Sequence, residues 1–97
     1  MKLKVGDLRI EWDSQKNSLN VKKHGIYFKD AAFVFFDKNR LEYYDIRHSD
    51  QEDRYIVIGM VYDVLFVIYT ERGEFIRIIS ARKATPIERE LYYGKNS

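Results

Sequence analysis

The sequence predicts a two-layer α+β domain in which an antiparallel β-sheet carries helices on one face. Residues 54–61, 64–70 and 75–81 are rich in β-branched and aromatic side chains, and the short turns between them favour antiparallel pairing. Capping signals before residues 14–24 and 86–93 indicate helices. The 97 residues suit one domain, and helices this short can cover only one sheet face. We therefore expect the whole chain to form one domain with the order β-α-α-β-β-β-β-α.

The first third of the chain predicts one strand and two helices. Residues 8–12 alternate apolar and polar side chains, as a half-buried strand does, and follow a loose turn. Asp13 or Ser14 then offers an N-cap oxygen to a helix over residues 14–24, and Gly25 supplies the left-handed stop. Residues 29–36 predict a second short helix with a broad apolar face.

The remaining segments predict the rest of the sheet and a last helix. Residues 40–46 form the second strand and the polar residues 47–53 form a loop ahead of the three long strands. Thr85 as N-cap, Pro86 at the first helical position and Glu88 three residues after the cap make a capping box for the final helix.

Composition excludes several classes of site. The chain has no cysteine, which rules out disulfides, thiolate metal sites and a cysteine nucleophile. It has no apolar stretch that approaches a membrane span, so we expect a cytoplasmic protein that does not contact membranes. The formal net charge of only +2 does not by itself indicate a nucleic-acid binder.

An arginine lies in the middle of the last predicted strand. With the hairpin turn centred on residues 72–73, Ile68 lies opposite Arg77 and Phe66 opposite Ile79. One sheet face then carries the cation, and we expect it to be the open one. Its residues are Phe66, Ile68, Thr70, Phe75, Arg77 and Ile79, whereas Leu65, Val67, Tyr69, Ile76, Ile78 and Ser80 face the helices.

Two interpretations of Arg77 remain open at this point. On an exposed sheet face its guanidinium could meet an anionic ligand. The alternative is a structural ion pair with Glu42, Glu52 or Glu74, in which the arginine stem covers apolar surface.

Four short motifs follow one another in the chain: KHG at residues 23–25, D-x-RH at 45–48, V-x-YT-x-R at 67–72 and RIISARKAT-x-x-E at 77–88. With these motifs in this order, residues 10–93 resemble the BrnT family, the toxin halves of type II toxin–antitoxin pairs. The resemblance implies a RelE-like fold and a ribonuclease that cleaves RNA without metal or other cofactor and so arrests translation. It also implies a small ribbon-helix-helix antitoxin, similar to BrnA, whose complex with the toxin binds operator DNA.

Such a reaction requires a proton acceptor, a proton donor and cations around the reacting phosphate. Arg77 and Arg82 are the candidate cations, because a planar guanidinium matches two phosphate oxygens. Arg82 belongs to the opposite strand alternation from Arg77. It can join the site only if the strand ends or twists before it.

The two histidines are candidates for proton transfer near neutral pH. His48 lies in a polar loop, and loops often carry functional residues. His24 precedes the predicted helix stop, so an interaction with the helix dipole is the alternative to catalysis. A zinc site formed by His24, His48 and Asp45 is a further, weaker alternative.

The remaining candidates are less specific. Thr70 either positions a phosphate or fills a strand position that suits its shape, and Glu71 or Glu52 could act as a base. Arg47 and Arg54 flank acidic residues, which favours a self-neutralising loop.

Two other functions compete with the ribonuclease. The open face could bind a partner protein without turnover, so that the chain acts only as corepressor of a small DNA-binding protein. It could also bind single-stranded nucleic acid through aromatic and cationic side chains.

Overall fold

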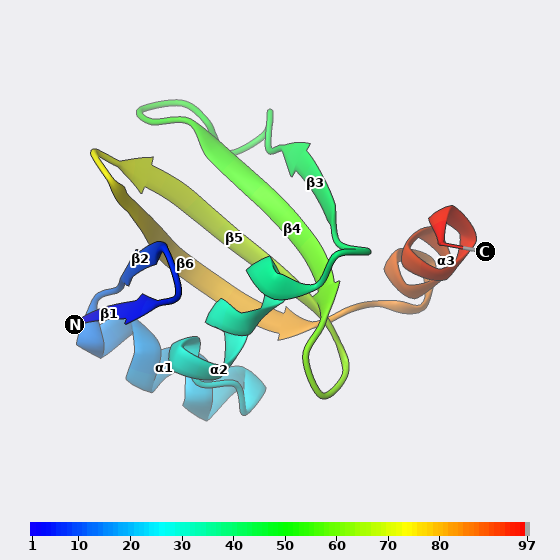
Figure 1. Cartoon of the computed structure of the whole chain (residues 1–97), viewed down its shortest axis with the longest axis horizontal. Coiled ribbons are helices and arrows are strands. Elements are labelled where there is room, and N and C mark those ends of the chain that lie inside the picture. Colours follow the sequence, from blue (N-terminus) through cyan, green and yellow to red (C-terminus); the bar gives the residue numbers. More distant parts are fainter. Residues whose placement is uncertain (97) are drawn as a thin grey trace.

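The computed structural model describes residues 1–96 and contains one six-stranded sheet with the strand order β1-β2-β6-β5-β4-β3 (Figure 1). Its strands are β1 (Lys2–Val5), β2 (Leu8–Glu11), β3 (Leu41–Tyr44), β4 (Arg54–Met60), β5 (Val64–Arg72) and β6 (Phe75–Lys83). Its helices are α1 (Ser14–His24), α2 (Phe28–Ala31), the 3₁₀ helix η1 (Ala32–Phe36) and α3 (Pro86–Lys95). The predicted α+β class is confirmed, whereas the predicted element order lacked the first strand.

The N-terminal strand was missed because its four residues include two lysines and give a weak alternation signal. It forms a hairpin with β2, and the turn requires glycine at Gly6, whose φ is +60°.

The sheet is not wholly antiparallel, which corrects the prediction. β3 to β6 form the expected antiparallel meander, but β2 lies parallel to β6, with Ile10 beside Ile76. Pairing between strands so distant in sequence is not encoded in either strand's local pattern, so the sequence could not reveal it.

Helix α1 begins and ends where predicted. The Asp13 side chain accepts hydrogen bonds from the backbone N–H groups of Gln15 and Lys16, and Gly25 ends the helix with a φ of +73°. Its Asn20 side chain donates to the carbonyl of Ala81 at 2.8 Å and accepts from the Ala81 N–H at 3.1 Å. Asn20 of α1 therefore pairs with backbone hydrogen-bonding groups at the edge of β6, beyond the point where β2 ends.

The predicted helix over residues 29–36 is split into α2 and η1. Together they bury Phe28, Val34 and Phe35 against the sheet. The approach is so close that a Cβ on Gly59 would lie 2.5 Å from a Val34 methyl group, so β4 needs glycine there.

Helices cover parts of both faces of the sheet, whereas the sequence predicted helices on one face only. α1, α2 and η1 pack with Leu65, Val67, Tyr69 and Ile78, the face expected to be covered. Helix α3 instead lies over one end of the opposite face, where Tyr92 packs with Ile58 and Val64.

Helix α3 begins with the predicted capping box of Thr85 and Glu88. The Tyr92 hydroxyl donates to Asp37 Oδ2 at 2.5 Å and so links α3 to the residue that follows η1. Burial, assisted by this bond to Asp37, raises the pKa of Tyr92 to about 12, so the phenol stays a donor at neutral pH.

A β-bulge in β6 changes the predicted register. Tyr69 lies opposite Ile78 but Ile68 lies opposite Ser80, so Ile79 is the extra residue. The hairpin turn is also displaced from the predicted position, because Arg72 pairs with Phe75 and Thr70 with Arg77, so the predicted pairs of Ile68 with Arg77 and of Phe66 with Ile79 are wrong. Because of the bulge, Ser80 is not on the covered face.

The bulge also reverses the alternation of β6 beyond it. Thr70 pairs with Arg77 before the bulge and Phe66 pairs with Arg82 after it. Both arginines therefore lie on the face opposite the three N-terminal helices, although their spacing in the sequence would separate them. None of the helices within residues 1–96 is long and apolar enough to cross a membrane.

Candidate functional site

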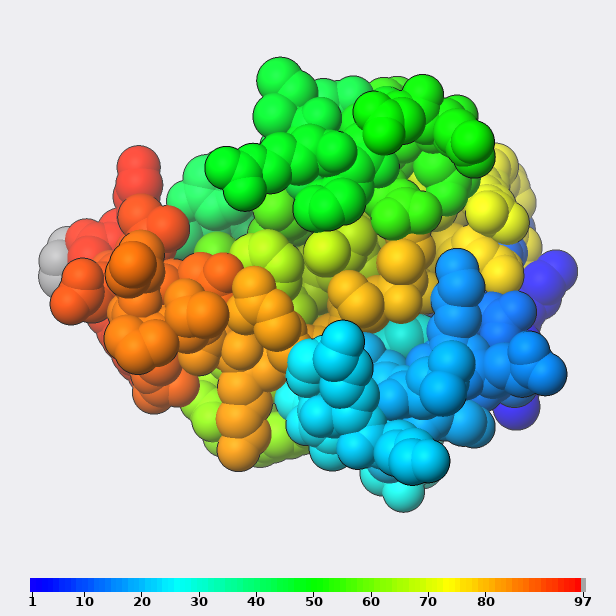
Figure 2. All heavy atoms as spheres, turned by 180° about the vertical axis from the view of Figure 1, so that it is seen from behind, coloured from blue at the N-terminus to red at the C-terminus, as the bar shows by residue number. Residues whose placement is uncertain are grey.

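A groove of about 500 Å³ lies on the partly open sheet face. Its floor consists of Ile56, Phe66 and Ile68, and Arg82 lines it from β6. Residues 44–48, where β3 runs into its loop, form the rim. Figure 2 shows this face, with β5 and β6 between the β3–β4 loop, α3 and α1. The groove brings together two of the predicted site residues, His48 and Arg82.

His48 is oriented by a buried carboxylate. Its Nδ1 lies 3.0 Å from Oδ2 of Asp45, whose side chain is 7% exposed, while the imidazole itself is 60% exposed. With Nδ1–H donating to the carboxylate, Nε2 is the ring atom with a free lone pair. A histidine held in this tautomer can accept a proton at Nε2 and later return it.

The loop that carries the histidine is held by hydrogen bonds from neighbouring strand ends. The Ser49 hydroxyl donates to the Asp45 carbonyl at 2.6 Å and accepts from the Arg54 N–H at 2.9 Å. The backbone N–H of Asp45 donates to the Arg54 carbonyl at 2.8 Å. The buried Thr70 hydroxyl donates to the Asp53 carbonyl at 2.6 Å, so this residue holds the loop's end.

Arg82 is held in place by Glu88. Its Nη1 and Nη2 donate to the two carboxylate oxygens at 2.7 and 3.0 Å, and Nη1 also donates to the Lys83 carbonyl at 3.2 Å. The guanidinium carbon lies 4.0 Å from the centroid of the Phe66 ring, which adds a cation–π contact. Its position is therefore fixed from three sides.

These contacts leave one edge of the Arg82 fork free. Of its five N–H donors, two point to Glu88 and one to the Lys83 carbonyl, which leaves one on Nε and one on Nη2. These two N–H bonds are parallel, and two oxygens of one phosphate can accept them together. Arg82 can therefore be structurally anchored and still bind an anion.

Glu88 remains ionised in this arrangement. Burial raises the pKa of its carboxyl group, but the hydrogen bonds from Arg82 and from the Thr85 backbone N–H outweigh that effect, so the pKa is lowered. One carboxylate thus both caps α3 and fixes the groove arginine.

Arg77 lies on the predicted face, but it forms a structural ion pair, which is the second of the two interpretations, and does not present the free guanidinium of the first. Its Nη1 donates to Glu11 Oε2 at 2.5 Å, and the two side chains are 22% and 13% exposed. The partner is none of the three glutamates that the sequence suggested, because β2 was not expected beside β6. The backbone N–H of Lys16 is the main cause of the lowered pKa of Asp13, to which the charge of Arg77 also contributes.

Glu71 and His24 lie outside the groove. Glu71 is exposed and follows Thr70 in β5, so its side chain projects to the other sheet face, where its charge contributes to the raised pKa of Tyr55, which is chiefly caused by burial. His24 is half-buried in the last turn of α1. Neither lines the groove.

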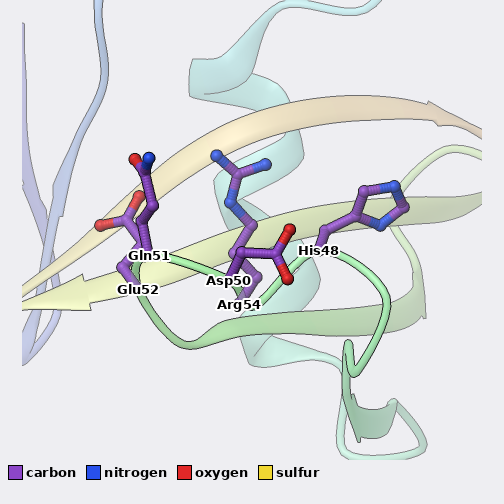
Figure 3. A pocket seen from close by; sticks show the side chains of 5 residues that line it. All are labelled: His48, Asp50, Gln51, Glu52 and Arg54. Carbon is purple, nitrogen blue, oxygen red and sulfur yellow. The ribbon is translucent and has the colours of Figure 1, made fainter.

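A second hollow of about 250 Å³ borders the groove and shares His48 with it. Figure 3 shows the Arg54 guanidinium and the Asp50 carboxylate in this hollow, with the His48 ring pointing away to one side. Arg54 makes no side-chain hydrogen bond or ion pair with any residue from 1 to 96, and its Nε is buried without a partner. The expected self-neutralising loop is therefore wrong for Arg54.

The structure does not assemble the alternative zinc site. Among residues 1–96, no group of three histidine, cysteine or acidic side chains is placed to hold a metal ion. Asp45 instead contacts His48 alone of the two histidines.

Three contributors to the site were missed from the sequence: Asp45 as the partner of His48, Glu88 as the partner of Arg82, and Arg54. The D-x-RH spacing contained a signal for the first, because a turn brings side chains three residues apart together. Glu88 was recognised only as a helix cap. Nothing local marks Arg54 as unpaired.

Comparisons with known proteins agree with this architecture. A family model described as "Ribonuclease toxin, BrnT, of type II toxin-antitoxin system" matches residues 12–88. The crystal structure of the Brucella abortus ribonuclease toxin BrnT superposes with a TM-score of 0.61 and is 27% identical, covering 78% of this chain and 95% of that one. A search of curated proteins found no match. Because the family model covers most of the chain, including both His48 and Arg82, this protein belongs to the BrnT family of ribonuclease toxins of type II toxin–antitoxin systems.

Proposed function

We propose that the chain is an endoribonuclease that cleaves RNA without a metal ion and uses the groove that contains His48 and Arg82. The observation that carries the proposal is the presence, in one groove, of an imidazole oriented by a buried carboxylate and a guanidinium with a free pair of donors. Attack of a ribose 2′-hydroxyl on its adjacent phosphate requires a group that accepts the hydroxyl proton and a cation that stabilises the charge on the phosphate. The imidazole and the guanidinium can supply these two functions.

In the proposed reaction, His48 Nε2 accepts the proton of a ribose 2′-hydroxyl. The 2′-oxygen attacks the adjacent phosphorus, and the bond from phosphorus to the 5′-oxygen of the next nucleotide breaks. The leaving 5′-oxygen takes up a proton from water, so the products are a 2′,3′-cyclic phosphate and a 5′-hydroxyl. The free Nε–H and Nη2–H of Arg82 stabilise the charge that develops on the phosphoryl oxygens.

The other predicted residues receive supporting roles in this proposal. Thr70 holds the end of the His48 loop, and Arg77 links β6 to β2 through Glu11. A direct role of Arg77 stays a prediction that Arg77→Ala tests: cleavage at least about tenfold slower supports the role, and an unchanged rate removes Arg77 from the site. Direct roles for Glu71 and His24 stay predictions that substitution can test.

The family implies an antitoxin partner and an RNA substrate. We propose, from the same resemblance, a RelE-like cytoplasmic toxin that arrests translation and is neutralised by a ribbon-helix-helix antitoxin, with operator DNA bound only through that complex.

A non-catalytic binding module is the second candidate. It is favoured by Ile46 on the rim of the groove, an aliphatic residue that is 81% exposed. In that case a partner protein, and no RNA, occupies the groove.

One experiment separates these functions. Purified chain is incubated with total RNA and with a single-stranded oligoribonucleotide, each with and without EDTA. The proposal predicts equal cleavage in both conditions and no cleavage when a 2′-deoxynucleotide stands at the mapped site. Intact RNA in both conditions favours the binding module, and cleavage lost with EDTA contradicts the metal-independent mechanism.

A further inference from the structure

We propose that the floor of the groove is a subsite for one unstacked nucleobase of single-stranded RNA, next to the phosphate that reacts. The proposal rests on the proposed ribonuclease function and names how that site holds its substrate. It adds a specific position for a base to a mechanism that otherwise concerns only ribose and phosphate.

The floor has the chemical character that a base requires. Ile56 and Ile68 are direct cross-strand partners and Phe66 follows on the same face of β5, and all three are half-buried. The three N-terminal helices do not cover this surface, because those helices pack on the other face. The Arg82 guanidinium lies over the Phe66 ring, so Ile56 and Ile68 are the part of the floor that a base can contact beside that arginine. An apolar surface beside polar groups is what a base with its flat π-face and polar edge fits.

The rim supplies a side chain that can cover the base. Ile46 is 81% exposed although it is aliphatic, and it lines the same groove as the floor. It lies two residues before His48, so a base between Ile46 and the floor lies close to the imidazole. Burial of this aliphatic side chain under a base removes apolar surface from water and so favours binding.

The charges around the floor fit a phosphate-linked ligand. Arg47 and Arg82 line the groove, and Arg47 has no hydrogen bond or ion pair with any of the described residues 1–96. The one carboxylate in the groove, Asp45, is buried and bonded to His48. A ligand that enters the groove thus meets an apolar floor and a cationic rim, which suits a nucleotide better than an uncharged apolar peptide.

Binding of uncleavable RNA tests the subsite independently of cleavage. The probe is a fluorescent, fully 2′-O-methylated oligonucleotide with the sequence around the mapped cleavage site or, where nothing is cut, each of four homopolymers. An abasic residue replaces each nucleotide in turn, and affinity is measured by fluorescence anisotropy. One position is expected to lose about 5- to 150-fold in affinity, the range typical for one stacked base.

Substitution of the rim residue assigns that position to the groove. Ile46→Ser is expected to weaken binding of the intact oligonucleotide about 3- to 10-fold, the loss expected when one or two buried methylene-sized groups are removed. It should not weaken binding of the oligonucleotide that is abasic at the sensitive position. Leu19→Ser is the matched control, because Leu19 is 65% exposed on α1 and does not line the groove. Both changes are on the surface, so folding is retained.

The possible outcomes separate the two proposals. Equal affinity of all abasic oligonucleotides, equal losses in Ile46→Ser with intact and abasic probes, or no RNA binding at all would overturn the subsite. If RNA is cleaved but no abasic position lowers the affinity, the subsite is contradicted and the ribonuclease proposal is not. A position-dependent loss coupled to Ile46, without cleavage of unmodified RNA, supports the subsite and contradicts the ribonuclease.

Discussion

Nδ1 of His48 lies 3.0 Å from the Oδ2 atom of Asp45, a carboxylate that the sheet buries while the imidazole stays exposed. The carboxylate that orients the histidine is therefore buried, while the imidazole that can exchange a proton is exposed to solvent. Because a strand end and a tight turn hold both residues, the orientation is in place before a substrate binds.

Asp45→Asn tests this orientation. The amide keeps the size of the side chain but can also donate a hydrogen bond to Nδ1, which places the proton on Nε2 instead. We expect kcat to fall by about two orders of magnitude with a small change in KM. Asp50→Asn is the control, since Asp50 is an exposed residue of the same loop that does not contact the histidine. Equal activity of the two variants would remove Asp45 from the mechanism.

Glu88→Gln tests whether the anchored arginine matters. The change weakens the paired bonds that fix the guanidinium, so we expect about tenfold slower cleavage, against about 100-fold for Arg82→Ala. The double variant should be no slower than Arg82→Ala, because Glu88 acts through Arg82. Asp63→Asn is the control: it removes the contact of Arg89 on the same helix without touching Arg82. If that control slows cleavage as much as Glu88→Gln, then docking of α3, and not the arginine, explains the loss.

Arg54→Met tests the unpaired guanidinium beside His48. The buried Nε has no partner among the described residues, so its removal should leave stability unchanged or slightly higher. We expect cleavage to fall about tenfold because a cation near the phosphate is lost. Arg72→Met is the matched control, as Arg72 is exposed at the β5–β6 hairpin and contacts Glu52. A less stable Arg54→Met protein with normal cleavage would assign the residue a purely structural role.

Acid should lower the stability of the fold through Asp37, the carboxylate that accepts a hydrogen bond from Tyr92 of α3. Burial raises the pKa of Asp37, but hydrogen bonds from the Tyr92 hydroxyl and the Met60 and Asn39 backbone N–H groups outweigh it, and the pKa falls below its usual value. A lowered pKa in the folded state means that the unfolded chain binds more protons near pH 4. The stabilisation is therefore present above that pH and is lost as the pH falls through the folded-state pKa.

Asp37→Asn provides the corresponding measurement. Urea unfolding midpoints between about pH 3 and pH 6 should rise with pH in the wild type and rise less steeply in the variant. At neutral pH the variant should lose about 1–3 kcal/mol, because buried hydrogen bonds to a charged acceptor are weakened. Parallel pH profiles would show that Asp37 does not titrate with unfolding.

Sequence reasoning succeeded where the determinants are local. The caps of α1 and α3 depend on residues within one turn, and Asp13, Gly25 and Thr85 identified them correctly. The three long strands were found because their β-branched pattern is strong. Helix α3 was placed on the wrong face because its cap says nothing about the surface on which the helix docks.

The site could be predicted only in part for a related reason. Residue type marked His48 and Arg82, but the bulge at Ile79 that brings Arg82 to the open face has no glycine or other local signal. The pairing of β2 with β6 decides the partner of Arg77, and it depends on contacts across most of the chain length. Such long-range packing must be seen in the structure.

The most direct measurement is the single-turnover cleavage rate of His48→Ala in EDTA, compared with wild type and with His24→Ala. We predict that the rate constant of His48→Ala falls at least about 100-fold, the contribution typical of general acid–base catalysis, while RNA affinity stays the same and the protein remains folded at the assay temperature. The His24→Ala protein should keep most of its activity, because His24 does not line the groove. Wild-type rates in folded His48→Ala would contradict the account, since no proton acceptor would then be required at the position that Asp45 orients.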